Sequence, residues 1–321
     1  MDIFIQQLIN GLVLGSIYAL VALGYTMVYG VLGLINFAHG EVLMIGALTA
    51  FSAISAATGI YPDLSGIALL TIGIFAAIPV CVAVSWTMEQ VAYRPLRNAP
   101  RLAPLITAIG ISITLQTLAM MIWGRNYLIF PETLPIEPIT LLNFEPNEHY
   151  DYSREVTITP IQLIIVFGAT LLMLFLTFLI NKTKLGLSIR ATAENPKMAS
   201  LMGINPNMVI SSTFIVGAVL AAIAGVMVAA NYAVAHFYMG FLPGLKAFTA
   251  AVVGGIGNLY GAMLGGLLLG IIEALCSGYL GQLTGGLLGS NYQDIFAFSI
   301  LILVLTLKPS GLLGDKNPDR V

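Results

Sequence analysis

The chain has 321 residues, of which 58% are hydrophobic and only 9% are charged, and its formal net charge is −2. Soluble domains carry about 25% charged residues, so a soluble protein of this size could not cover its surface with so few charges. The sequence has no basic patch of the kind that would indicate nucleic-acid binding. Several apolar runs reach the ~20 residues that cross a bilayer, whereas a membrane β-barrel would show short alternating segments. The composition therefore predicts an all-α, polytopic transmembrane helical bundle.

Eight apolar spans of roughly 20 residues or more are expected along the chain. They cover residues 3–29, 31–57, 64–88, 102–123, 160–181, 208–232, 247–275 and 292–307. The first span starts at Ile3 without a basic segment or a convincing cleavage site, so we expect it to stay as a helix. Cys81 and Cys276 fall inside spans and are expected to be small buried hydrophobes rather than a disulfide or metal pair. We expect a single transmembrane domain over residues 1–321.

Lysine and arginine gather in three segments outside the spans, and the positive-inside rule predicts that all three face the cytoplasm. They are Arg94, Arg97 and Arg101, then Lys182, Lys184, Arg190 and Lys197, and finally Lys308, Lys316 and Arg320 in the C-terminal tail. The loop at 124–160 should then face the periplasm. Its acidic and proline-rich composition predicts an irregular rather than helical segment.

The orientation of the C-terminal tail requires one more crossing, or a re-entrant segment, after residue 207. Residues 248–266, F-T-A-A-V-V-G-G-I-G-N-L-Y-G-A-M-L-G-G, offer a place because each glycine weakens a helix by about 1 kcal/mol relative to alanine. A broken or re-entrant helix at this depth must be surrounded by protein or a water-filled cavity. A straight helix, packed closely through Gly257, Gly261 and Gly265, is the alternative.

A second irregular stretch, residues 29–47, also contains several glycines and carries Asn36, His39 and Glu41. Interrupted helices at corresponding positions of two halves are typical of a transporter pathway. The two stretches are not visibly homologous, so an internal repeat is a hypothesis only. If the first stretch is also re-entrant, the N-terminus moves to the cytoplasm.

The stretch at 190–206, R-A-T-A-E-N-P-K-M-A-S-L-M-G-I-N-P, is polar although apolar spans flank it. Asn195 and Pro196 are typical of a helix start, and Gly203 is typical of a helix stop. The pattern predicts a short helix over 196–202, and Asn205-Pro206 then begins the next span. The helix places Met198, Leu201 and Met202 on one face.

So short a helix is not stable alone in water and needs a surface to pack on. On one hypothesis the helix packs on the protein's own loops or at the lipid interface. On the other hypothesis it docks to a cytoplasmic partner. The sequence contains no G-x-x-x-x-G-K-[ST] phosphate loop, no H-E-x-x-H and no catalytic G-x-S-x-G arrangement. We therefore expect that the chain neither hydrolyses ATP nor acts as an enzyme.

Five segments closely resemble the inner-membrane permease subunit of bacterial branched-chain amino acid ABC importers, the LivH-type family, and the resemblance covers nearly the whole chain. They are G-L-V-L-G-S-I-Y-A-L-V-A-L-G-Y-T-M-V-Y-G at 11–30, I-N-F-A-H-G-E at 35–41, A-Y-R-P-L-R at 92–97, E-N-P-K-M-A-S-L-M-G-I-N at 194–205 and V-V-G-G-I-G-N-L-Y-G-A-M-L-G-G at 252–266. The resemblance implies the ABC importer permease fold and a passive subunit that moves leucine, isoleucine, valine or related amino acids across the inner membrane.

The resemblance also implies that the loop at 182–207 carries the coupling helix that docks in a cleft of an ATPase subunit. The residues expected to serve this coupling are Glu194, Asn195, Pro196, Met198, Ala199, Leu201, Met202 and Gly203. The segment departs from the glutamate-alanine-alanine form of other ABC importers, because Asn-Pro follows Glu194. The implied partners are a paralogous permease, two cytoplasmic ATPases and a periplasmic binding protein. ATP and magnesium would reside on the ATPases, with no cofactor in this chain.

Ionisable residues inside the bilayer are costly and call for an explanation. We expect the translocation pathway to involve Asn36, His39, Glu41, Gly254, Gly255, Gly257, Asn258 and Glu273. The alternative for Asn36, His39 and Glu41 is a structural network that fixes a helix break, and Glu273 could instead snorkel or be protonated. Glu89 is expected at the surface or in an interface. Arg94 and Arg97 are expected to anchor the inside boundary or to touch the ATPase.

Two further hypotheses come from the residues alone. The first is a self-sufficient, ion-coupled secondary transporter of a small apolar solute, with His39, Glu41 and Glu273 as a proton or sodium relay. Such a carrier would not require the short docking helix at 195–203. The second, a polytopic membrane enzyme, lacks a catalytic constellation. The acidic residues Glu145, Glu148 and Asp151 of the 124–160 loop are expected to contact the binding protein.

Overall fold

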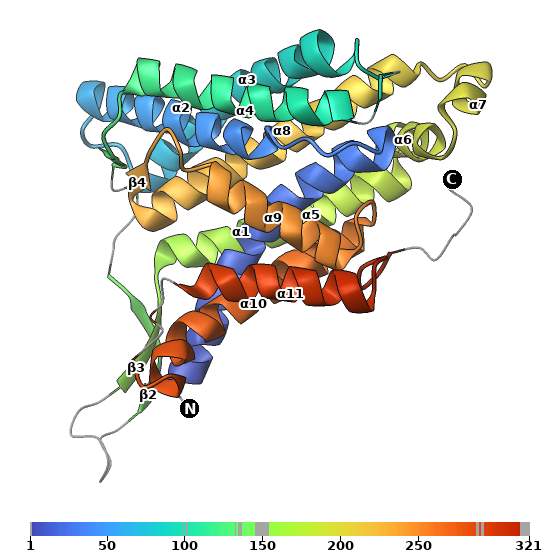
Figure 1. Cartoon of the computed structure of the whole chain (residues 1–321). Coiled ribbons are helices and arrows are strands. Elements are labelled where there is room, and N and C mark those ends of the chain that lie inside the picture. Colours follow the sequence, from blue (N-terminus) through green and yellow to red (C-terminus); the bar gives the residue numbers. More distant parts are fainter. Residues whose placement is uncertain are drawn as a thin grey trace.

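The computed structural model describes residues 2–97, 99–100, 102–131, 133, 137–144, 154–286, 289 and 292–314. The chain folds into an elongated bundle of helices with small strand pairs at one end (Figure 1). In chain order the elements are α1 (Asp2–Leu32), α2 (His39–Ile60), α3 (Gly66–Met88), η1 (Glu89–Tyr93), α4 (Leu102–Trp123), β1 (Leu128–Ile129), β2 (Ile139–Phe144), β3 (Arg154–Ile158), α5 (Pro160–Lys182), α6 (Lys184–Glu194), α7 (Pro196–Leu201), α8 (Pro206–Tyr232), β4 (Val234–Ala235), α9 (Phe241–Gly254), α10 (Leu259–Leu283) and α11 (Gln293–Leu307).

The described helices confirm the prediction of a multi-pass membrane protein. Seven of them are long and apolar enough to cross a bilayer, and α9 and α11 are shorter apolar helices. α1 and α8 lie at the centre, since most of their residues are buried, whereas α3, α4 and α5 expose large apolar side chains on the outside. An apolar outer surface is what a hydrocarbon environment allows.

Strands β2 and β3 mark one end of the bundle, which we call the hairpin end, and α7 marks the other, the α7 end (Figure 1). β2 and β3 form an antiparallel pair within the 124–160 loop, so the expectation of an irregular loop is wrong for this part. The expected binding-protein contacts Glu145, Glu148 and Asp151 lie outside the described residues. The N-terminal end of α1 is at the hairpin end, because Thr157 N donates to Gln6 Oε1 at 2.8 Å.

The described parts of the three cationic segments lie together at the α7 end. Arg97 Nη1 donates to Asn207 Oδ1 at 2.5 Å, which places the first segment beside the start of α8. Asn258 Nδ2 donates to Leu313 O at 2.8 Å, and the neighbouring Tyr260 hydroxyl accepts from Asn181 Nδ2 at 3.1 Å. Arg101, Lys316 and Arg320 lie outside the described residues.

The single span expected at 247–275 is wrong, because the structure divides it between two helices. α9 ends at Gly254, residues 255–258 form a tight turn in which Gly255 has φ 109°, and α10 begins at Leu259. The alternative of one straight helix through Gly257 is thereby excluded. The division supplies the extra crossing that the position of the C-terminal tail required. The N-terminus lies at the hairpin end, where Gln6 bonds Thr157.

The turn at 255–258 lies in the glycine-rich stretch 248–266, where the sequence placed a break, and two further breaks interrupt helices inside the bundle. The first is residues 33–38 between α1 and α2, within the irregular stretch at 29–47. The second is residues 233–240 between α8 and α9, which the sequence did not indicate. The second break starts at Ala233, a non-glycine residue with φ 55°, so no glycine or proline marks the residue where α8 ends.

Glycines let the central helices approach at backbone distance. A Cβ at Gly11 would lie 2.6 Å from Ile271 Cα, and one at Gly15 would lie 2.8 Å from Leu267 Cα, so α1 packs antiparallel against α10. A Cβ at Gly270 would clash with the backbone of Gly15. Close contact between small residues is a main source of helix association in lipid, where no hydrophobic effect drives helices together.

We expect Gly270→Val to destabilise the protein, since a side chain there must push α1 away from α10 and overpacking costs about 1–3 kcal/mol or more. The matched control is Gly110→Val in α4, where nothing lies within 4 Å of the added Cβ. The folded fraction and melting temperature in detergent measure the difference. Equal melting temperatures for the two variants would contradict the assigned packing.

Candidate functional site

The short helix α7 has both of the ends that the sequence predicts. The Asn195 side chain accepts hydrogen bonds from Lys197 N at 3.1 Å and Met198 N at 3.0 Å. At the other end Gly203 has φ 84°, its N–H donates to Ser200 O at 3.1 Å, and Ile204 N donates to Ala199 O at 3.1 Å. This pair of bonds is the Schellman stop, which favours glycine because of the left-handed conformation.

The apolar face of α7 is uncovered. Met198 is 57% exposed, and Leu201 and Met202 are 81% and 82% exposed, whereas Ala199 is buried against the protein. The described residues therefore do not provide the surface that a helix of this length needs for stability. α7 is an apolar projection at the end of the bundle (Figure 1).

Rigid joints hold α7 between its neighbours. α6 precedes it and is capped by Thr183, whose hydroxyl accepts from Gly186 N at 3.1 Å. Arg190 of α6 donates from Nη1 to Ile180 O at 2.6 Å, which ties α6 back to the end of α5. On the other side the Asn205 side chain accepts from Asn207 N at 3.0 Å and caps α8. A displacement of α7 would therefore be carried directly into the first turn of α8.

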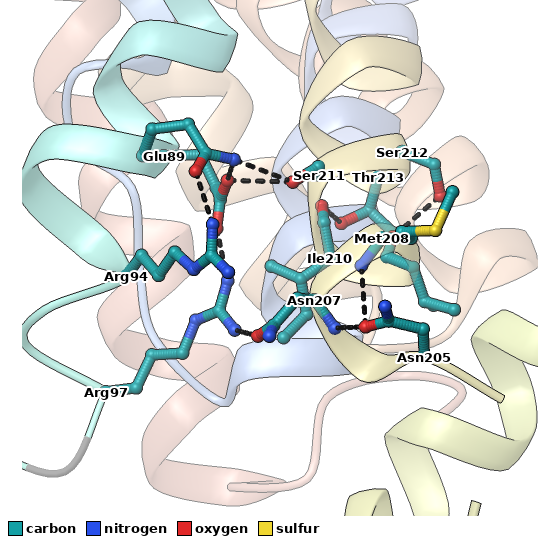
Figure 2. A network of polar contacts seen from close by, with 12 residues as sticks. Glu89, Arg94, Arg97, Asn205, Asn207, Met208, Ile210, Ser211, Ser212 and Thr213 are labelled. Carbon is teal, nitrogen blue, oxygen red and sulfur yellow. Dashed lines mark hydrogen bonds and ion pairs between the residues drawn. The ribbon is translucent and has the colours of Figure 1, made fainter. Parts of the chain in front are cut away.

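Glu89 is not at the surface, contrary to expectation. It is fully buried at the α7 end of α3, it forms an ion pair with Arg97, and its Oε2 accepts from Ser211 Oγ at 2.8 Å (Figure 2). Arg97, expected at the membrane boundary or on a partner, lies at the α7 end and bonds Glu89 and Asn207. Burial of the carboxylate requires this pairing, because an unpaired charge would be strongly unfavourable.

The two helices that follow the breaks, α2 and α9, meet at glycines. A Cβ on Gly244 would lie 2.9 Å from Gly40 Cα, and a Cβ on Gly240 would lie 3.0 Å from Met44 Cβ. The starts of α2 and α9 are thus in backbone contact inside the bundle. Any passage between them is closed in this conformation.

Asn36, His39 and Glu41 surround this contact, but their side chains have separate partners. Asn36 Oδ1 accepts from Tyr93 OH at 2.7 Å and from Ala38 N at 3.1 Å. The His39 ring lies edge-on to Tyr25, with centroids 4.9 Å apart. Glu41 Oε1 accepts hydrogen bonds from side chains of α4. The three residues join the first break to three different helices rather than forming one cluster.

Ser112 and Gln116 of α4 are site residues that the sequence did not indicate. Ser112 Oγ donates to Glu41 Oε1 at 3.0 Å, and Gln116 Nε2 donates to the same oxygen at 2.7 Å. Both residues sit among exposed apolar side chains in an otherwise plain span. Their i, i+4 spacing on one helix face was the only available signal.

Several buried polar atoms in and near the first break have no hydrogen-bond partner among the described residues. They are Thr26 Oγ1, Asn36 Nδ2, His39 Nε2 and Glu41 Oε2. Unsatisfied buried groups are rare in native structures, because each costs about 1–3 kcal/mol. The other four such atoms among the described residues lie in other parts of the chain and are Thr49 Oγ1, Arg97 Nε, Thr192 Oγ1 and Asp294 Oδ1, the last of which is in an ion pair with Lys246.

Glu273 lies apart from the contact between α2 and α9, and its carboxylate is paired with Lys246 and Tyr18. Its Oε1 is 2.7 Å from Lys246 Nζ, and its Oε2 accepts from Tyr18 OH at 3.0 Å. Lys246 Nζ is also 2.7 Å from Asp294 Oδ1 of α11. The network ties α1, α9, α10 and α11 together. The sequence analysis did not indicate Lys246, which lies just before the glycine-rich stretch at 248–266.

The turn between α9 and α10 also lies away from the contact between α2 and α9. It holds the expected pathway residues Gly254, Gly255, Gly257 and Asn258. The C-terminal segment covers this turn: Leu312 N donates to Val253 O and Leu313 N donates to Gly254 O, both at 2.8 Å. These bonds satisfy carbonyls at the end of α9 that have no partner within the helix. The expected pathway residues thus divide into three separate places. No group of three or more metal-ligating side chains occurs among the described residues.

Comparison with known proteins gives a consistent result. The family model described as "Branched-chain amino acid transport system / permease component" matches residues 7–305. The chain is 45% identical over 318 residues to the high-affinity branched-chain amino acid transport system permease protein LivH of Escherichia coli, covering 99% of this chain and 98% of the relative.

Two further relatives extend the comparison. The permease protein BraD of Pseudomonas aeruginosa is 46% identical over 319 residues, covering 99% of this chain and 98% of that protein. The probable permease protein LivH of Methanocaldococcus jannaschii is 26% identical over 315 residues, covering 98% and 94%. No solved structure matches the chain. A helical bundle that spans the membrane, the family match over nearly its whole length and these identities show that the chain belongs to the family of permease components of branched-chain amino acid transport systems.

Proposed function

We propose that this chain is the membrane-embedded permease subunit of an ATP-driven importer for leucine, isoleucine, valine or related amino acids, and that α7 receives the force. It is a passive transport subunit, and separate ATPase chains bind ATP and magnesium. The α7 end faces the cytoplasm in this proposal, as the positive-inside rule requires of Arg94, Arg97, Lys182 and Lys184.

The observation that carries the proposal is the uncovered apolar face of α7. Met198, Leu201 and Met202 are more than half exposed although rigid caps fix both ends of the helix. Full burial of each such side chain is worth ~1.5–3 kcal/mol, so a partner with an apolar cleft gains substantial free energy by covering them. Glu194 and Ala199 flank this face, one before the N-cap and one against the protein. A self-sufficient carrier would have no use for such a projection.

The contact between α2 and α9 is where we place the cargo path. Leucine, isoleucine and valine are zwitterions with apolar side chains, so a path needs a few polar groups within an apolar wall. Asn36 Nδ2, His39 Nε2 and Glu41 Oε2 lack partners in the closed conformation and could be satisfied by a passing cargo. Opening the contact between Gly40 and Gly244 is the step that would expose them. Glu273 and the turn at 254–258 have structural contacts, and we do not place them in the path.

The remaining subunits follow from the family. We propose a paralogous permease as the membrane partner, two ATPases at the α7 end and a periplasmic binding protein at the hairpin end. The complex would reside in the inner membrane. Selection of cargo would rest mainly with the binding protein, because a tight site in the permease would retain the amino acid.

Reconstitution of the complete complex in liposomes tests this function. With wild-type ATPases and ATP inside the liposomes, uptake of radiolabelled leucine should require the binding protein. A protonophore should leave initial uptake unchanged, whereas an ATPase variant that cannot hydrolyse ATP should abolish it. Uptake that collapses with the proton or sodium gradient and persists without ATP would contradict the proposal and favour the ion-coupled carrier.

The role of α7 is tested by the double variant Met198→Asp/Leu201→Asp. Losing two buried apolar contacts should weaken binding of the ATPase by about 100-fold or more, while the permease remains in the membrane. Ser200→Asp is the control, since it adds a charge to the same helix outside the apolar face. Gly203→Val should also uncouple transport, because a β-branched residue is strained at φ 84°.

Affinity purification followed by ATPase and uptake assays on one preparation gives the answer. Normal retention of the ATPase together with normal uptake in the double variant would show that the apolar face of α7 contacts no subunit.

A further inference from the structure

The segment Glu89–Arg97, which joins α3 to the following loop, contacts two functional regions of the chain. α3 continues into the π-helical turn η1, which Arg94 N closes by donating to Glu89 O at 2.8 Å. Single π-helical turns are rare and often mark functional positions, since the wider turn re-aims side chains. Here it turns Glu89 and Tyr93 into the protein, where both are buried.

On one side the segment is bonded to the start of α8 (Figure 2). Ser211 Oγ donates to Glu89 Oε2 at 2.8 Å, and Arg97 Nη1 donates to Asn207 Oδ1 at 2.5 Å. Asn207 and Ser211 lie in the first two turns of α8, which begins at Pro206 directly after the cap that ends the coupling loop. A movement of α7 therefore reaches this contact through only a few residues of rigid chain.

On the other side the segment is bonded to the first helix break. Tyr93 OH donates to Asn36 Oδ1 at 2.7 Å, and Asn36 in turn holds Ala38 N just before α2 begins. The Tyr93 ring packs against Phe214 of α8, with centroids 5.4 Å apart. The break leads directly into the contact between Gly40 and α9 that closes the bundle.

We infer that Glu89–Arg97 is a mechanical link, which carries the displacement of α7 and the start of α8 to the break at 33–38 and so to the α2–α9 contact. The inference rests on the proposed function and adds positioning residues to it. The contacts form one continuous series, from α8 through Glu89 and Arg97 to Tyr93 and Asn36. Arg97 Nη1 and Nη2 are bonded to Asn207 and Glu89, so the inference needs no ATPase contact of Arg97.

The pairing pattern allows the link to be cut without leaving a buried charge unpaired. Glu89 and Arg97 belong to the same segment, so their ion pair survives when the side chains on α8 are shortened. The test variant is therefore Asn207→Ala/Ser211→Ala. The cap of α8 is also retained, because Asn205 accepts from the backbone N–H of residue 207 and not from its side chain.

Two controls match this variant. Ser212→Ala removes a neighbouring hydroxyl that donates only within α8, to Val209 O at 2.7 Å. Thr87→Ala removes a hydroxyl at the end of α3, just before the linking segment, where Thr87 Oγ1 donates to Ala83 O at 2.7 Å within the same helix. Neither change breaks a contact between the segment and α8.

The measurement is leucine uptake per ATP hydrolysed by the reconstituted complex, with subunit retention and melting temperature recorded on the same preparations. Asn207→Ala/Ser211→Ala should assemble normally and lower the ratio by about fivefold or more, which is the usual range of coupling between two sites. The controls should keep the ratio within about twofold of the wild type. Asn207→Asp/Ser211→Thr, which preserves both hydrogen bonds, should restore it.

Tyr93→Phe tests the far end of the series, since it removes only the hydroxyl that holds Asn36. It should also lower the ratio, and adding it to Asn207→Ala/Ser211→Ala should cause little further loss, because both changes interrupt one path. Losses that simply multiply would indicate independent structural roles and overturn the inference.

A purely structural role for these contacts would lower the melting temperature or subunit retention and leave uptake per ATP unchanged, which would also overturn the inference. A wild-type complex that shows no ATP-dependent uptake would instead overturn the proposed function, and this link with it. The wild-type arm of the experiment thus separates the two failures.

Discussion

The need to satisfy every backbone polar group inside the bilayer governs this structure, because hydrocarbon offers no hydrogen bonds in exchange. Continuous helices meet the requirement by themselves, but the two breaks do not. At the first break Asn36 supplies a side-chain acceptor for Ala38 N and is itself held by Tyr93. At the second, β4 pairs with β1, and Phe130 N donates to Ala233 O at 2.9 Å. Each break is therefore tied to a distant segment of the chain.

These ties bring the starts of α2 and α9 face to face in the interior. Backbone contact at Gly40 and Gly244 replaces a side-chain interface, so the region can be closed without a bulky plug. A contact between backbones holds few interlocking side chains, and separating it costs less packing than separating an ordinary core. The unpartnered polar atoms gathered nearby are consistent with a place that changes its partners during a transport cycle.

The two ends of the bundle differ in the way they use polarity. At the α7 end a buried ion pair and its hydrogen bonds hold α3 to α8, while the adjacent helix α7 leaves an apolar face uncovered. The Lys246–Glu273–Asp294 network has the same holding role among α9, α10 and α11. Charged networks thus join neighbouring helices at both sites, and the exposed apolar face of α7 lies where docking is proposed.

The sequence alone determined the membrane class, most spans and the complete form of α7, because these depend on composition and on local signals such as Asn195-Pro196 and Gly203. It also located the first break through its polar residues. It could not locate the second break, since Ala233 adopts its left-handed conformation under tertiary constraint and carries no local signal. Nor could it assign Glu89, Glu273 or Glu41 to their partners, because Ser211, Lys246 and Gln116 lie on other helices. Which charges are paired and which polar atoms remain free was decided only when the folded chain brought distant residues together, because pairing depends on distance in space and not on spacing along the sequence.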